Sequence, residues 1–384
     1  MGHKEKKAYL AAIRKRYRKG NKELKSRILD EFCAVCKYHR KYASNLLWQP
    51  FRKKRSKTKK RGKRSIYNQS YILEPLTKIW LSTNQMCSKK LKAALPIWLP
   101  FYEDEYGQLL EESKNKLLVI SASTIDRLLK PNKAKFKRKG LCGTKPGSLL
   151  KNQIPIRTDN WDITKPGFCE ADTVAHCGNS LSGDFAWSLT LTDIYSAWTE
   201  NRAIWGKGSQ GVLEQIQDIE SKLPFQLLGF DCDNGSEFLN HHLIRYFSDR
   251  PKAKLVQFSR SRPYHKNDNA HVEQKNWTHV RQLFGYDRFD KKPLIPLMND
   301  LYRKEYSLLQ NYFCPTMKLL SKERVNSKYR KKYGIPQTPY QRLLTSDHIH
   351  PDAKQKLTRI YESLNPFILR RNIETKLKNI FNLI

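Results

Sequence analysis

Long uncharged apolar stretches are missing from this sequence of 384 residues. A membrane-spanning helix needs about 20 consecutive apolar residues, so we expect no transmembrane segment. Neither end carries a lipidation motif, and the basic residues 1–7 lead into no apolar signal region. These absences argue against a membrane partner.

The eight cysteines form no dense framework, which indicates free thiols in a reducing cytoplasm. Cys33, Cys36 and His39 resemble half of a zinc site, but no fourth ligand stands at a usable spacing. Packing of the two thiols between helices is therefore the preferred interpretation. No segment recurs with a period of about 20–50 residues, so a repeat architecture is excluded.

Acidic residues are scarce, because 73 Lys and Arg face 36 Asp and Glu, for a net charge of +37. Such an excess repels itself in a compact chain unless a polyanion neutralises it. Contacts of Lys and Arg with phosphates release counterions and supply much of the affinity of nucleic-acid-binding proteins. The sequence therefore predicts double-stranded DNA as the partner and no small-molecule substrate.

The first predicted domain, residues 1–65, begins with a basic segment over 1–20 that we expect to be mobile. Apolar residues at helical spacing over 24–32, a break, and a second stripe over 42–47 predict a helix-turn-helix. A nearly all-basic linker over 51–64 follows and is expected to lie along phosphates. The DNA contacts predicted here are Arg40, Lys41, Arg52, Lys53, Lys54 and Arg55.

Residues 66–165 form the second predicted region, helical from 71 and basic and irregular from 131. Pro96 and Pro100 are expected to bracket a short segment. Ser and Thr residues over 121–124 favour the start of a helix, and Arg127 is expected on its outward face. This helix is a candidate for a second recognition helix that contacts DNA through Arg127.

Residues 166–290 alternate between strand and helix patterns. Strands are predicted over 167–177, 185–192, 199–205, 227–230 and 254–258, and helices over 210–223, 240–249 and 269–284. Three adjacent strands followed by alternating helices and strands predict an α/β RNase H-like core with a mixed five-stranded sheet. Residues 291–384 are expected to be a basic C-terminal region, helical in places, with a cationic run over 324–332.

Three carboxylates stand where such a core would bring them together. Asp172 lies in the middle of the first strand, Asp233 follows a buried strand at an Asn-Gly turn, and Glu273 lies in the last core helix. Converging carboxylates repel one another unless cations lie between them. Oxygen ligands favour Mg²⁺ or Mn²⁺, and two such ions would serve in-line phosphoryl transfer.

Other acids in the same segments stay open as alternatives. Asp231 shares its side of the strand with Asp233, and Asp268 could replace Glu273 as the third ligand, although it suits a helix cap. Glu170 lies on the same strand face as Asp172 and is expected to assist. Glu237 is expected to support the site or lie on the surface.

Three motifs carry a resemblance to a known family. They are Glu170-Ala-Asp172-Thr, then Asp233-Asn-Gly-Ser-Glu-Phe238, then the segment 261–276 with Asn-Ala-His-Val before Glu273. Together they resemble the DDE signature of retroviral integrases and bacterial insertion-sequence transposases. The resemblance implies that Asp172, Asp233 and Glu273 are catalytic, that the enzyme acts as a homo-oligomer on DNA, and that it lies with the nucleoid of a bacterium.

The chain departs from the family pattern at two positions beside the third acid. Ala270 stands where the family usually has Gly, and Gln274 stands where it often has Arg. The spacing of 40 positions between Asp233 and Glu273 is also slightly longer than the usual one. These departures affect the loop and leave the three acids in place.

A basic, partly aromatic patch surrounds these motifs and is suited to phosphates and unpaired bases. Its predicted DNA contacts are Arg260, Arg262, Lys266, Lys275 and Arg281, with Tyr264 and His265 beside them. The function predicted from the sequence is a transposase that cleaves DNA at element ends and joins them to target DNA. The alternatives are a DNA-binding regulator with a relict core and a structure-selective nuclease of the same fold.

Overall fold

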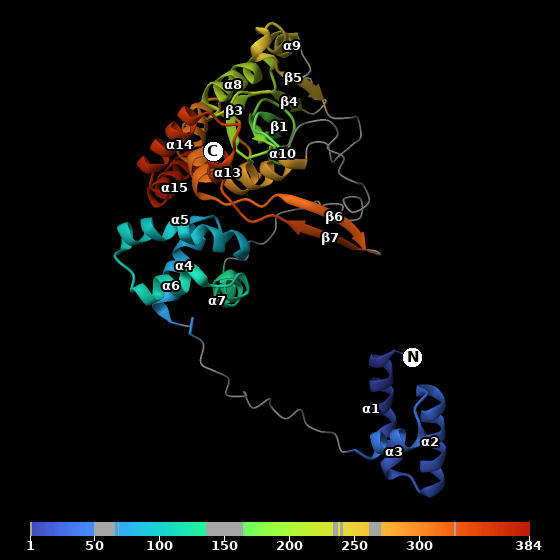
Figure 1. Ribbon diagram of the computed structural model, residues 1–384. Coiled ribbons are helices and arrows are strands. Elements are labelled where there is room, and N and C mark those ends of the chain that lie inside the picture. The colour runs from blue at the N-terminus through green and yellow to red at the C-terminus, as the bar shows by residue number, and fades with distance from the viewer. Residues whose placement is uncertain are drawn as a thin grey trace. The chain divides into compact units, whose positions relative to one another are not determined.

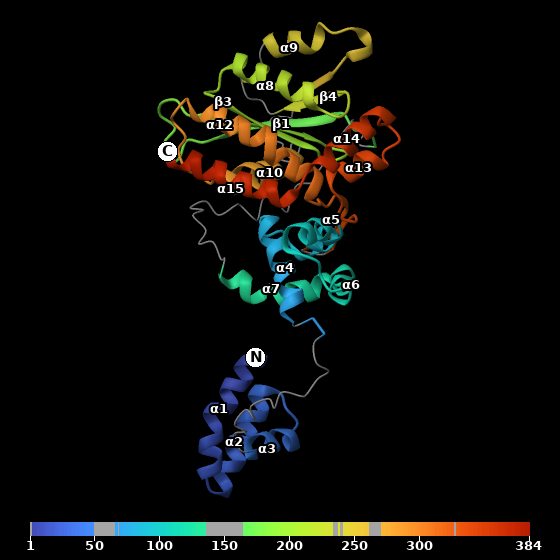
Figure 2. The same ribbon diagram turned by 90° about the vertical axis from the view of Figure 1, so that its left-hand side faces the viewer.

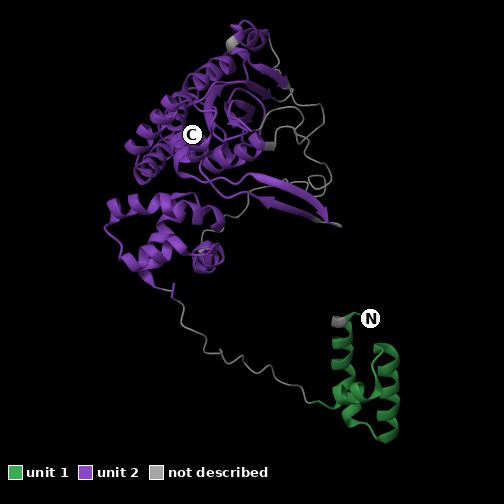
Figure 3. Cartoon of the chain, viewed as in Figure 1, with its two compact units in different colours: residues 1–65 green, residues 66–384 purple. Residues whose placement is uncertain are grey.

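The computed structural model describes residues 2–49, 66–67, 69–135, 164–232, 237–238, 241–260, 270–325 and 328–384. Two compact units divide the chain, residues 1–65 and residues 66–384 (Figure 3). The boundaries predicted near residues 165 and 290, inside the second unit, stay predictions.

The first unit is built from three helices, α1 (His3–Lys19), α2 (Lys22–Cys36) and α3 (Arg40–Trp48). The expectation of a mobile segment over residues 1–20 is wrong, because α1 buries Ile13 and Tyr17 against the other two helices. Asn21 caps α2 by accepting a hydrogen bond from the Leu24 amide, and Lys37 ends it in the left-handed conformation. The remaining core residues are Ile28, Leu29, Phe32, Cys36, Ala43 and Leu47.

The second unit begins with four helices, α4 (Ser70–Ser82), α5 (Ser88–Tyr106), α6 (Glu111–Val119) and α7 (Ala122–Lys135). Pro96 and Pro100 do not bracket a short segment, since α5 continues through both. The indole of Trp98 is buried and donates to the carbonyl of Phe313 at 2.8 Å. These helices therefore share one hydrophobic core with the C-terminal part of the chain.

The centre of the second unit is a mixed sheet of five strands. They are β1 (Phe168–Ala175), β2 (Ala186–Asp193), β3 (Thr199–Trp205), β4 (Gly229–Cys232) and β5 (Gln257–Arg260). Their order is β3-β2-β1-β4-β5, with β1, β2 and β3 antiparallel and β1, β4 and β5 parallel (Figure 1). Three consecutive strands and two parallel additions confirm the predicted RNase H-like topology.

The sheet has one apolar and one polar face. Leu189, Leu191 and Phe230 pack under α8 (Ser209–Lys222) and α9 (His241–Ser248). The opposite face carries Glu170 and Asp172 and is covered by α10 (Ala270–Lys275) and its continuation. Figure 2 shows α8 and α9 on one side of the sheet and α10, α12 and α15 on the other.

The chain after α10 is helical for most of its length. It comprises the π-helical segment η3 (Asn276–Arg281), α11 (Gln282–Phe284), α12 (Leu294–Leu301), the π-helical segments η4 (Tyr302–Tyr306) and η5 (Leu309–Phe313), α13 (Pro339–Thr345), α14 (Pro351–Ser363) and α15 (Pro366–Asn382). An antiparallel hairpin of β6 (Leu319–Val325) and β7 (Lys328–Tyr333) interrupts these helices and contains most of the cationic run. No helix in the ranges given above is long and apolar enough to cross a bilayer.

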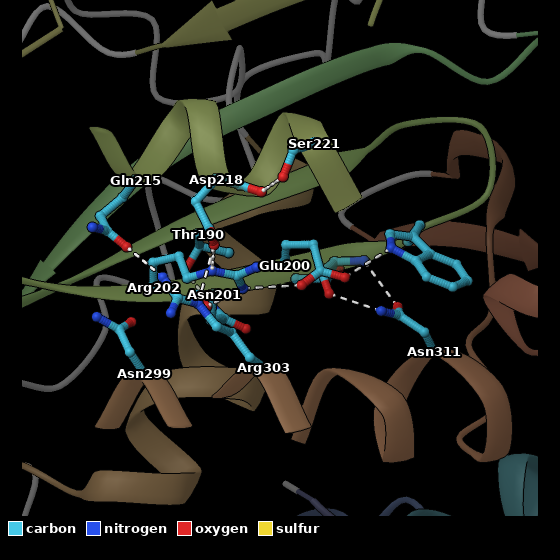
Figure 4. A network of polar contacts seen from close by, with 12 residues as sticks. Thr190, Glu200, Asn201, Arg202, Gln215, Asp218, Ser221, Asn299, Arg303 and Asn311 are labelled. Atoms are coloured by element: carbon cyan, nitrogen blue, oxygen red, sulfur yellow. Dashed lines mark hydrogen bonds and ion pairs between the residues drawn. The ribbon is translucent and has the colours of Figure 1, made fainter. Parts of the chain in front are cut away.

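Side chains of the C-terminal helices cover the edge strand β3. The Asn299 amide accepts from the Ala203 N–H at 2.7 Å and donates to the Ala203 carbonyl at 2.9 Å. Asn311 repeats both bonds with Thr199 at 2.9 Å. Between them, buried Arg202 donates to the Asn201 carbonyl and pairs with Glu200 and Asp218 (Figure 4). Edge-strand backbone groups that would otherwise be buried without partners are satisfied in this way.

Candidate active site

Asp172 stands on the central strand with its side chain toward α10 and η3. Its register partner across the sheet is Thr190 on β2. The Asp172 carboxylate is partly exposed and accepts hydrogen bonds from the Asn276 side-chain amide and the Thr173 backbone N–H, both at 2.7 Å. The bond to Asn276 joins β1, which carries the first predicted catalytic acid, to the helical segment that follows Glu273.

Glu170, two residues earlier on the same face, caps the helix that carries Glu273. Its Oε2 accepts from the backbone N–H groups of His271 and Val272, both at 2.9 Å, and its side chain is buried. A carboxylate at these positions satisfies amides that the first turn leaves unpaired and complements the helix dipole. The strand and the helix are therefore locked together at the level of the site.

The pKa of Glu170 is raised to about 8, mainly by burial and also by the negative charges of Asp231 and Glu273, against the lowering effect of the two backbone donors. Asp231 on β4 is the register partner of Glu170 and accepts from the Ser259 hydroxyl at 2.7 Å. Glu273 is exposed on α10. Acids from three elements thus converge on the polar face and repel one another electrostatically.

Asp233, the second predicted catalytic acid, lies outside the described residues, as does the alternative ligand Asp268. The structure shows that β4 ends at Cys232, directly before Asp233. Parallel strands β1 and β4 pair along Phe168–Ala171 and Gly229–Cys232, so the last residue of β4 lies beside Ala171, next to Asp172 in sequence. The three-acid set stays a prediction.

Within the part of the chain that the structure covers, no three His, Cys, Asp or Glu side chains are grouped to hold a metal ion. Cys36 is buried in the helical core, as a packing role requires. The donors on the polar face are nevertheless of the kind that fits Mg²⁺ or Mn²⁺. They are carboxylates whose mutual repulsion a cation would relieve, and those of Asp172, Asp231 and Glu273 are at least partly exposed.

Glu237 supports β1 from the other face of the sheet. It is buried, accepts from the Thr173 hydroxyl at 3.1 Å, and pairs with the Lys207 ammonium at 3.0 Å. Because Thr173 follows Asp172, this contact fixes the strand next to the candidate ligand. Of the two roles open for Glu237 in the sequence, its burial rules out the surface one.

The predicted DNA-contacting residues fall into four groups. Arg40 and Lys41 are exposed at the start of α3, with Arg40 paired to Asp30, and exposed Arg127 on α7 donates to the Thr124 hydroxyl at 3.0 Å. Arg260 is the last residue of β5. The residues outside the described ranges are Arg52, Lys53, Lys54, Arg55, Arg262 and Lys266, together with Tyr264 and His265.

Lys275 and Arg281 form the fourth group and point inward. Lys275 is only 7% exposed, and its ammonium donates to the Ala197 carbonyl at 3.2 Å. Burial lowers the pKa of Lys275 to about 7. Arg281 is partly buried and donates to the Ala175 carbonyl at 3.0 Å. Both cations are held by backbone oxygens of the core, which argues against the predicted phosphate contacts. The β2–β3 turn, which covers this side of α10, could not be placed from the sequence.

The fold and the polar face define an RNase H-like α/β protein with a carboxylate cluster on its central strand. The chain is 36% identical over 336 residues to the uncharacterized protein y4rM of Sinorhizobium fredii (strain NBRC 101917 / NGR234), an alignment that covers 86% of this chain and 93% of that protein. The chain belongs to the same family as y4rM. No family model matches the sequence.

A comparison with solved structures matches part of the chain to the catalytic core domain of BIV integrase in crystal form I. It aligns with a TM-score of 0.28 and 14% sequence identity, covering 47% of this chain and 96% of that one.

Proposed function

We propose that this protein is a DDE-type DNA transposase, which cleaves DNA strands at the ends of a mobile element and joins them to target DNA. The observation that supports this most directly is the coupling of Asp172 and the helix of Glu273. Glu170 caps that helix, and Asn276 binds Asp172. A scaffold for DNA binding alone has no physical need to hold repelling acids on a polar sheet face.

In this proposal Asp172, Asp233 and Glu273 hold one or two Mg²⁺ or Mn²⁺ ions. When bound, the ions supply Lewis-acid stabilisation of phosphodiester oxygens. The protein's own contribution is positional. Asn276 orients the Asp172 carboxylate through its 2.7 Å hydrogen bond, and Glu170 fixes the first turn of the helix that presents Glu273. The nucleophile is water for cleavage and a 3′-hydroxyl for joining.

The DNA partner follows from the net charge of +37. We assign sequence-specific end binding to the first unit, with α2 and α3 as a helix-turn-helix that presents Arg40 and Lys41, and additional contact to Arg127 on α7. The basic residues 52–55 contact phosphates between these elements. Because two ends must be processed together, the protein acts as a homo-oligomer on DNA in the bacterial nucleoid.

The test is a cleavage and strand-transfer assay on DNA from both flanks of the gene, with and without Mg²⁺. Asp172→Asn, Asp233→Asn and Glu273→Gln should each abolish both reactions and leave DNA binding intact. Asp347→Asn, which removes one exposed acid from the second unit, is the matched control and should react like the unaltered protein.

Other results would favour a different function for this protein. Binding without any nick or joint in Mg²⁺ or Mn²⁺ would favour the regulator with a relict core. Nicking of branched DNA without sequence preference would favour the structure-selective nuclease. Loss of DNA binding in the Asp233→Asn variant would mean that the acid has been misassigned.

A further inference from the structure

The hairpin of β6 and β7 is a basic ribbon with both faces in solvent. Residues 319–333 contain six basic side chains and one acid, Glu323. β6 is exposed at both ends and partly buried only at Ser321 and Lys322, and residues 330–333 of β7 are all exposed. A lone two-stranded hairpin is marginally stable in water, so one with this charge needs either a firm anchor or a partner.

The register of the hairpin places like charges opposite each other. Lys322 is the register partner of Lys331, and Arg324 is the partner of Tyr329. The Lys322 ammonium lies over the Tyr329 ring at 4.5 Å from its centroid. Like charges directly opposite each other on one face of a hairpin are destabilising. A polyanion bound along this face would attract both lysines and offset the repulsion between them.

The base of the ribbon is anchored to the core. Thr316 and Gln337 exchange backbone hydrogen bonds at 2.8 and 3.2 Å. Arg342, which is buried, donates to the Thr316 carbonyl at 2.6 Å and to the Ser196 carbonyl at 2.9 Å. The Lys318 ammonium donates to the Tyr195 carbonyl at 2.7 Å. The base of the ribbon is therefore held against the turn between β2 and β3.

The same turn touches the helix of the candidate active site. Lys275 on α10 donates to the Ala197 carbonyl of that turn. The first turn of the same helix binds Glu170 through the backbone N–H of His271. The ribbon consequently starts beside the carboxylates, and in Figure 1 β6 and β7 run out from the core next to α10.

We propose that the β6–β7 ribbon lies along the backbone of double-stranded DNA and holds the duplex beside the carboxylate cluster, with Lys322, Arg324 and Lys331 on phosphates. The inference rests on the proposed function only for the identity of the duplex as substrate. A two-stranded ribbon is of a size that a DNA groove admits. An anionic membrane would also attract the charge, but the ribbon starts beside acids suited to phosphodiester chemistry.

The test compares the full-length protein with the triple variant Lys322→Gln, Arg324→Gln, Lys331→Gln. The control is Lys356→Gln, Arg359→Gln, Lys378→Gln, which removes the same charge from exposed positions of α14 and α15. Affinity for a duplex of random sequence is measured from low to high salt. Each lost phosphate contact lowers the slope of log K against log[salt] by about 0.9, so at about 0.15 M salt three lost contacts weaken binding roughly 100-fold.

We expect the ribbon variant to show this weakening with unchanged or higher thermal stability, since the Lys322–Lys331 repulsion is removed. The control should lose less than a third of that slope. Equal salt slopes for the ribbon variant and the unaltered protein would overturn the proposal, as would ribbon-dependent binding to phosphatidylglycerol vesicles without any to DNA. If ribbon-dependent binding is found but no strand is cut, the proposed function fails while the ribbon assignment stands.

Discussion

Replacing Glu170 by Gln should flatten the pH dependence of stability in the metal-free protein. The folded state raises the pKa of Glu170 from 4.5 to about 8, with burial as the largest cause. Folding therefore favours the protonated acid. The cost of ionising it is absent below the unfolded pKa, grows as pH rises through the interval, and is complete above the folded pKa.

The size of the effect follows from these two pKa values. The pKa of Glu170 is 4.5 in the unfolded chain and about 8 in the folded protein. This difference lowers the unfolding free energy by roughly 2–3 kcal/mol between about pH 5 and pH 7. A Gln side-chain oxygen can still accept from the His271 and Val272 amides, so the capping contact survives in neutral form. Asp193, whose pKa burial raises to about 6, titrates in both proteins and cancels in the comparison.

The assay is urea denaturation of both proteins at several pH values in the presence of a chelator. The difference in unfolding free energy between Glu170→Gln and the unaltered chain should shift in favour of the variant by that amount as pH rises. If the unfolding free energies of the two proteins changed in parallel with pH, the reasoning would be refuted. Glu170 would then be ionised in the folded state already at low pH, without a pKa raised by burial and by the charges of Asp231 and Glu273.

Three further outcomes follow from contacts in the core. Asn299→Leu leaves the buried N–H and carbonyl of Ala203 without partners, at about 1–3 kcal/mol each, and should lower stability and speed amide exchange at Ala203, whereas Asn299→Asp should retain the bond to the N–H. Asn276→Ala should slow strand transfer without changing DNA affinity, because the Asp172 carboxylate loses the side-chain donor that orients it; a weaker affinity would contradict a purely orienting role. Phe32→Ala should cost about 3–5 kcal/mol and melt only the three-helix unit in circular dichroism, and a loss of the sheet signal as well would contradict independent folding.

The strands of the sheet and the face that carries the acids could be predicted from the sequence. All five strands were predicted within a few residues, because each is a short apolar or alternating run bounded by turn residues. Glu170 and Asp172 were also placed correctly on one face, since side chains alternate along a strand. The predicted order of strands and helices then left few topologies open, and the observed one is among them.

The misses share a physical cause, which is that long-range packing overrides local composition. Ile13 and Tyr17 stand in a dense basic segment, so only contact with α2 and α3 reveals that the segment is a helix. Lys275 is polar by type but is buried under a turn from another part of the sheet. The β6–β7 hairpin carries so many cations that local propensity favours no strand, and its anchor at Arg342 lies beyond it in sequence.

The hydrogen bonds that Asn299 and Asn311 make with the edge strand β3 have a consequence for assembly. Carbonyls of Thr199, Asn201 and Ala203 are already occupied by Asn311, Arg202 and Asn299. A strand from a second molecule could hydrogen-bond there only by displacing side chains that are themselves packed in the interior. Copies of this protein that gather on DNA therefore cannot extend the sheet at β3, and a contact between them at this edge would have to be made by the helices that cover it.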